Sequence, residues 1–83
     1  MIMAHAYDHY SASHELATCL LAEGQVEWHD KLEDAIAEGT TATEILMALR
    51  FVLRSLKSRS LALTECTNDR MNTLLTEVDR SLA

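Results

Sequence analysis

The sequence predicts an all-α protein, and two features of its composition support this fold class. Apolar residues make up 48% of the 83 residues but aromatic residues only 5%, so a core has to be built mainly from aliphatic side chains. Such a core suits packed helices. The chain also contains no proline and only two glycines, whereas a β-protein normally needs more turn residues. A chain of this length is expected to form a single helical domain.

Charge and hydropathy disfavour several classes of partner. The formal net charge of −6 argues against nucleic acid, because neutralising phosphates requires a basic surface. The apolar run 16–22 (LATCLLA) is far shorter than a membrane span, and no signal-peptide pattern is present, so no membrane partner is expected. We therefore expect a cytoplasmic protein in which Cys19 and Cys66 are reduced thiols rather than a disulfide.

Residues 11–38 are predicted to form the first helix, preceded by a frayed N-terminal segment, residues 1–10. Ser11 or Ser13 is the expected N-cap. The second half of this helix is amphipathic, which is typical of a helix that buries one face. Residues 16–22 are instead apolar nearly all round, so we expect them to be covered on more than one side.

Residues 39–41 are predicted to form a tight turn between two helices. Gly39 can adopt a positive φ without steric cost and is the expected C-cap of the first helix. Thr41 followed by Glu44 is typical of a capping box at the start of the next helix. Because one helix ends and another begins within about three residues, the two helices must be antiparallel neighbours.

Residues 42–82 are predicted to form a long second helix. Apolar residues recur along it at steps of three or four, and they include Leu46, Leu49, Leu53, Leu56, Leu63, Met71, Leu74, Val78 and Leu82. If continuous, this helix spans about 60 Å, against about 42 Å for the first helix, so its far end needs cover from elsewhere. The alternative is a break near residues 64–69, although no glycine or proline marks it.

Two assemblies would cover the remaining apolar surface. In the preferred one, two copies of the antiparallel hairpin form a homodimer, a dimeric four-helix-type bundle that covers residues 16–22 and 61–82 together. In the alternative, the chain reverses near residues 64–69 and forms a monomeric three-helix bundle. The homodimer is preferred because an isolated hairpin shelters only one face of each helix.

We predict that the protein acts by binding a partner protein, as a small interaction or regulatory module. One candidate surface is the acidic face of the first helix, whose carboxylates follow a helical spacing. Its candidate residues are Glu23, Glu27, Asp30 and Asp34. A second candidate is the pair Met47 and Phe51, which lies on the side of the second helix opposite Leu49. Such a pair indicates either a contact surface or a second buried face.

The sequence gives little support to a metal or catalytic site. His5 and His9 share the i,i+4 spacing of paired helical zinc ligands, but His14 falls on the opposite face and leaves the ligand set incomplete. No spacing links a nucleophile to a base, so neither a catalytic residue nor a cofactor is predicted. The alternative function is a small metal- or nucleotide-dependent helical enzyme with a site at the dimer interface.

Overall fold

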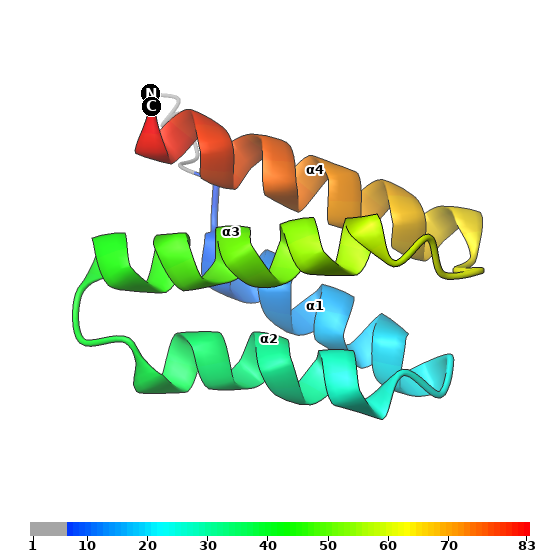
Figure 1. The fold of residues 1–83 in the computed structure, drawn as a ribbon. Helices are drawn as coiled ribbons and strands as arrows, with labels where there is room; N and C mark the ends of the chain where they lie inside the picture. Colours follow the sequence, from blue (N-terminus) through cyan, green and yellow to red (C-terminus); the bar gives the residue numbers. More distant parts are fainter. Residues whose placement is uncertain (1–6) are drawn as a thin grey trace, which may run out of the picture.

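The structure, a computed structural model, describes residues 7–83 and confirms the all-helical fold class. These residues form four helices and no strand (Figure 1). The helices are α1 (His9–Ala22), α2 (Val26–Glu38), α3 (Ala42–Ser58) and α4 (Glu65–Leu82). In this part of the chain, no helix combines the length and the apolar character needed to cross a membrane.

Helix α1 begins two residues earlier than predicted, and its N-cap is Asp8 rather than a serine. The Asp8 carboxylate accepts hydrogen bonds from the backbone N–H groups of Tyr10 and Ser11, both at 3.1 Å. A carboxylate suits this position because it also complements the positive end of the helix dipole. Of the segment predicted to be frayed, residues 1–6 lie outside the described residues.

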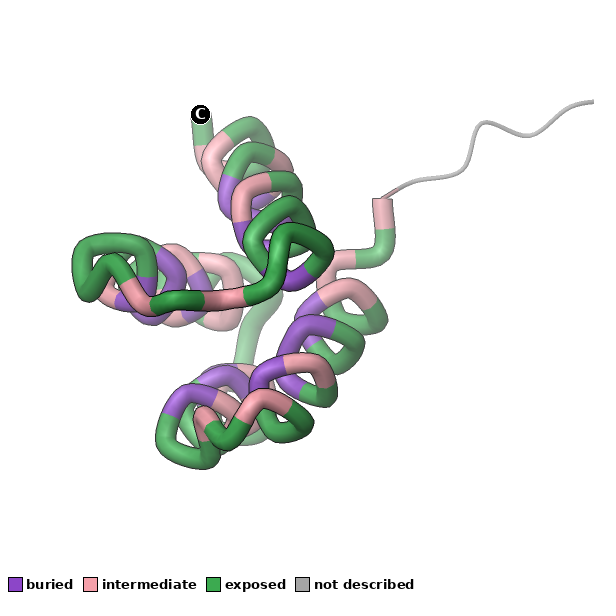
Figure 2. Tube along the Cα trace, turned by 90° about the vertical axis from the view of Figure 1, so that its right-hand side faces the viewer, coloured by how far each residue is buried: buried purple, intermediate pink, exposed green. Residues whose placement is uncertain are grey.

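The four helices pack in a ring: each contacts the next along the chain, and α1 contacts α4. Viewed along the bundle, buried positions on all four helices face the middle (Figure 2). The fully buried side chains are mostly aliphatic, as the composition predicts, and the largest are Leu16, Leu20, Leu32, Leu49, Leu53, Leu56, Leu74 and Val78. Burial of these side chains is the main stabilising contribution to the fold.

The predicted continuous helix over residues 11–38 is wrong, because the chain breaks at Gly24. Gly24 has a φ of +80°, a left-handed conformation that glycine adopts without steric cost. Its N–H donates to the Leu21 carbonyl (3.0 Å), and the Gln25 N–H donates to the Leu20 carbonyl (2.8 Å). These two bonds form a Schellman motif, which satisfies carbonyls left free at the end of α1.

The predicted turn at residues 39–41 is present between α2 and α3. Thr41 Oγ1 accepts from the Glu44 N–H (3.2 Å), while the Glu44 carboxylate accepts from the N–H of Thr40 (3.1 Å) instead of that of Thr41. Gly39 differs from the prediction, because its φ of −76° is not left-handed. Glycine is needed there for space, since a Cβ would clash with the side chain of Ile45.

The predicted long helix over residues 42–82 is also wrong, because the chain leaves helical geometry after Ser58. Ser60 has a φ of +53°, and residues 61–64 form the connection to α4. Thr64 is the N-cap of α4, and its Oγ1 accepts from the Thr67 N–H (3.3 Å). The break therefore begins earlier than the segment 64–69 that the sequence left as the alternative.

These two breaks remove the reason for which a dimer was predicted. Shorter helices fold back on one another, so Leu16, Ala17 and Leu20 and most apolar residues of 61–82 find apolar neighbours within one chain. Leu21 stays exposed, so the run 16–22 is not covered all round as predicted. Leu16 and Leu20 of α1 and Leu74 and Val78 of α4 are all fully buried. A three-helix arrangement is likewise replaced by four helices in one chain.

Candidate protein-interaction surface

Glu23, the first residue of the predicted acidic face, is used within the fold. Its carboxylate accepts hydrogen bonds from the Thr64 N–H (2.9 Å) and the Thr64 hydroxyl (3.0 Å), and from the Thr67 hydroxyl. The hydrogen bonds from Thr67 and Thr64 hold the pKa of Glu23 below its usual range, because they stabilise the charged form. Glu23 thus helps to cap α4.

The other three acidic candidates lie on α2, and all are exposed. Glu27 forms an ion pair with Lys31 (3.2 Å), and the Asp30 carboxylate lies within hydrogen-bond distance of Nδ1 of its neighbour His29 (2.9 Å). Asp34 instead borders the groove between α2 and α3. The acidic face is therefore divided: part of it is partnered locally, and Asp34 belongs to the surface described next.

Helices α2 and α3 form a shallow groove on the outside of the bundle. Its lining residues are Trp28, Lys31, Asp34, Ala35, Glu38, Ala48, Phe51, Val52 and Ser55. A second hollow lies on the other side of Phe51, and it is lined by Met47, Arg50, Phe51, Arg54, Ser55 and Ser58. We call these two hollows and the residues that line them the α2–α3 face. Phe51 and Ser55 line both hollows, and Phe51 forms the apolar ridge between them.

Phe51 and Met47 are the exposed apolar residues of this face, with 74% and 51% of their surface accessible. Their exposure follows from the periodicity of α3, in which Leu49 and Leu53 point into the core. At about 100° per residue, Phe51 lies roughly opposite both leucines. Of the predicted partner-binding residues, Met47, Phe51 and Asp34 are thus brought together on one surface.

The two borders of the α2–α3 face carry opposite charges. On α2, Lys31 lies 4.4 Å from the centre of the Trp28 ring and pairs with Glu27, and Arg59 lies 5.9 Å from the same ring. Asp34 and Glu38 give negative charge to the rest of this border. On α3, the border beyond Phe51 carries Arg50 and Arg54. Arg54 also contacts Asp79 of α4 at 3.3 Å. An apolar ridge therefore separates an acidic border from a basic one.

The histidine pair considered as a metal site is only half described, because His5 lies outside residues 7–83. His9 is held against the end of α4: its Nε2 lies 3.1 Å from the Ser81 hydroxyl and 3.4 Å from the Glu77 carbonyl. Within the described chain, no three His, Cys, Asp or Glu side chains are placed so that they could hold a metal ion together.

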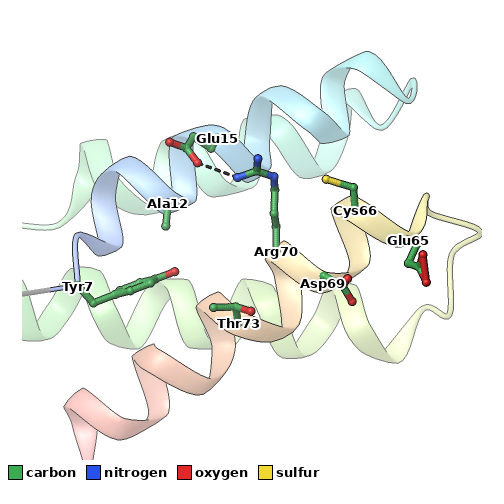
Figure 3. A pocket seen from close by; sticks show the side chains of 8 residues that line it. All are labelled: Tyr7, Ala12, Glu15, Glu65, Cys66, Asp69, Arg70 and Thr73. Atoms are coloured by element: carbon green, nitrogen blue, oxygen red, sulfur yellow. Dashed lines mark hydrogen bonds and ion pairs between the residues drawn. The ribbon is translucent and has the colours of Figure 1, made fainter.

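A further cavity, between α1 and α4, was not predicted from the sequence (Figure 3). Glu15 and Arg70 form an ion pair across it at 2.7 Å, and Cys66 lies beside Arg70. Cys19 and Cys66 are both free thiols. Residues 15 and 70 are too far apart in sequence for any local spacing to reveal this contact, which depends on how α4 packs against α1.

Comparison of the chain with known proteins identifies no relative, since no family model, curated protein or solved structure matches it.

Proposed function

We propose that this protein acts by binding another protein through the α2–α3 face. The observation that carries the proposal is the exposure of Phe51, 74% accessible on a helix whose other large apolar residues are mostly buried. Exposed apolar residues bordered by polar groups are typical of protein contact surfaces. Aromatic and arginine side chains are also the types that contribute most to binding between proteins.

The sequence-based prediction named the acidic face and the Met47–Phe51 pair as separate candidate surfaces, whereas the proposal combines parts of both in one surface. The acidic face contributes mainly through Asp34, because Glu23 is engaged in the fold and Glu27 has a partner in Lys31. Met47 and Phe51 supply the apolar centre of the surface. The predicted homodimer remains part of the proposal, but its support is now the α2–α3 face instead of residues 16–22 and 61–82.

Site-specific photocrosslinking in cells tests the proposal. A photoreactive phenylalanine analogue at position 51 is expected to form a defined adduct, whose mass and peptides identify what contacts the face. The matched control places the same analogue at Asp69, which is exposed in the α1–α4 cavity, away from the face. An adduct at position 51 that is absent at position 69 supports the proposal, and equal labelling at both positions contradicts it.

Phe51→Ser in the same cells provides a second readout. We expect it to abolish co-purification of the protein identified by crosslinking while leaving the amount of folded protein unchanged, since Phe51 is largely exposed. Undiminished co-purification would show that the α2–α3 face is not the binding surface.

A further inference from the structure

We infer that the occupant of the α2–α3 face is a second copy of this chain, so that the protein is a homodimer joined through Phe51. The inference rests on the proposed function, because it names the partner of the same face. The arrangement differs from the dimer predicted from the sequence, in which residues 16–22 and 61–82 were buried between copies.

The order of charges across the face carries the inference. Asp34 and Glu38 lie along the α2 border, Phe51 lies in the middle, and Arg50 and Arg54 lie along the far border of α3. Because Arg54 is paired with Asp79 of α4, Arg50 is the main source of positive charge on that border. At about 100° per residue, the two arginines project from the side of α3 opposite the side that forms the groove with α2. The α2–α3 face of each chain therefore carries both an acidic border and a basic border, which are complementary in charge.

A two-fold axis that lies in the interface and runs parallel to α3 brings the complementary borders together. It exchanges the two sides of the face, so the acidic border of each copy meets the basic border of the other. Asp34 lies on the acidic border and Arg50 on the basic one, so we expect these two residues to face each other across the interface. Each dimer would contain two such Arg50–Asp34 contacts.

The other simple arrangement is electrostatically unfavourable. A two-fold axis in the interface but perpendicular to the helices keeps each border on its own side, so acidic residues would meet acidic residues and arginines would meet arginines. With the axis parallel to α3, Phe51 lies near the axis and packs against the apolar centre of the second copy. Both Phe51 side chains are thereby removed from water.

Sedimentation velocity of the purified chain over a range of micromolar concentrations tests the dimer. We expect a species of twice the chain mass of 9.3 kDa. Phe51→Ser should raise the Kd by about tenfold or more, with unchanged helical circular dichroism. The matched control is Leu21→Ser, at an exposed apolar residue of α1 outside the face, and it should leave the dimer intact. A monomer at all concentrations, or a dimer unaffected by Phe51→Ser, overturns the inference.

Exchange of charges tests the arrangement. Asp34→Arg and Arg50→Asp should each weaken self-association, because each homodimer then places like charges opposite one another. An equimolar mixture of the two variants should form a heterodimer, since every contact between position 34 and position 50 is again attractive. Lys57→Asp is the control: it changes a neighbouring charge on α3 outside the face and should not pair with Asp34→Arg. Failure of the mixture to associate overturns the arrangement.

The crosslinking experiment separates this inference from the proposed function. An adduct at position 51 that contains two copies of the chain supports both. An adduct with a different protein, formed by a chain that sediments as a monomer, supports the proposed function and overturns the second copy as occupant. Absence of any adduct at position 51 contradicts both.

Discussion

Glu23, in the turn after α1, accepts a hydrogen bond from the backbone N–H of Thr64, the N-cap of α4, at 2.9 Å. The same carboxylate accepts from the hydroxyls of Thr64 and Thr67. One side chain thus joins the α1–α2 turn to the α3–α4 connection, both of which lie at the right-hand end of the bundle in Figure 1. The contact links the two halves of the chain where both predicted long helices break.

Glu23→Gln is expected to lower the melting temperature. An amide has only one acceptor oxygen, whereas the carboxylate accepts from the Thr64 N–H with one oxygen and from the two threonine hydroxyls with the other. The amide also lacks the charge that strengthens these hydrogen bonds. Glu27→Gln, which removes only an exposed ion pair with Lys31, is the control and should have little effect. Thermal unfolding followed by circular dichroism measures both, and equal changes in the two variants would contradict a special role for Glu23.

Thr64→Ala should destabilise the protein by about 1 kcal/mol, because it removes the N-cap of α4. Since Thr64 also donates to Glu23, its effect should not add to that of Glu23→Gln. Urea unfolding of the two single variants and the double variant measures this coupling. Strict additivity would show that the two residues act independently.

Stability should fall as the pH is lowered through the acidic range. Hydrogen bonds lower the folded-state pKa of Glu23, of Glu44 through the Thr40 hydroxyl, and of Asp8 through the Ser11 N–H. A carboxyl whose pKa is lowered by folding stabilises the folded state, and this stabilisation is fully present above the ordinary pKa of the group, near 4.5 for the two glutamates. The stabilisation is lost as the pH falls through the lower pKa of the folded state. Urea midpoints measured from pH 7 to pH 3 test this. Glu23→Gln should flatten the decline, and an unchanged slope would argue against Glu23 as a contributor.

Gly24→Ala should destabilise the protein by about 1 kcal/mol, because a residue with a Cβ is strained at positive φ. A Cβ at this position would have no neighbouring atom within 4 Å, so the cost comes from the backbone conformation and not from a clash with another residue. Gly24→Asn should be tolerated better, since asparagine adopts the left-handed region more readily. Urea unfolding compares the two, and an alanine variant as stable as the parent would contradict the left-handed assignment.

Substitution of Leu53 should destabilise the chain strongly, and substitution of Phe51 should hardly change its stability, although the two residues are only two positions apart. Leu53 is fully buried, so Leu53→Ala should cost about 2–5 kcal/mol and Leu53→Asp should prevent folding. Phe51→Ala should change the stability of a single chain by no more than about 0.5 kcal/mol, because its side chain is mostly exposed. Urea unfolding at concentrations well below the Kd of any dimer makes this comparison. Similar losses in both would mean that Phe51 is part of the core.

The helical class, the turn at residues 39–41 and the inward face of α3 could all be predicted from the sequence. Each depends on local properties: composition, the Thr41–Glu44 spacing and a helical period that places Leu49 and Leu53 on one side and Phe51 on the other. The same period identified Met47 and Phe51 as lying off the core-facing side. Local spacing therefore also revealed the centre of the candidate surface.

The two breaks, the four-helix packing and the long-range contacts were decided only by the tertiary structure. A glycine within an apolar helical pattern costs only about 1 kcal/mol, so periodicity alone did not show that the chain would turn at Gly24. The turn is favoured because it lets α1 pack against both α2 and α4, which buries residues that one long helix would leave exposed. The ion pair of Glu15 with Arg70 and the bonds of Glu23 to Thr64 follow from that packing, because they join residues that only the folded chain brings together.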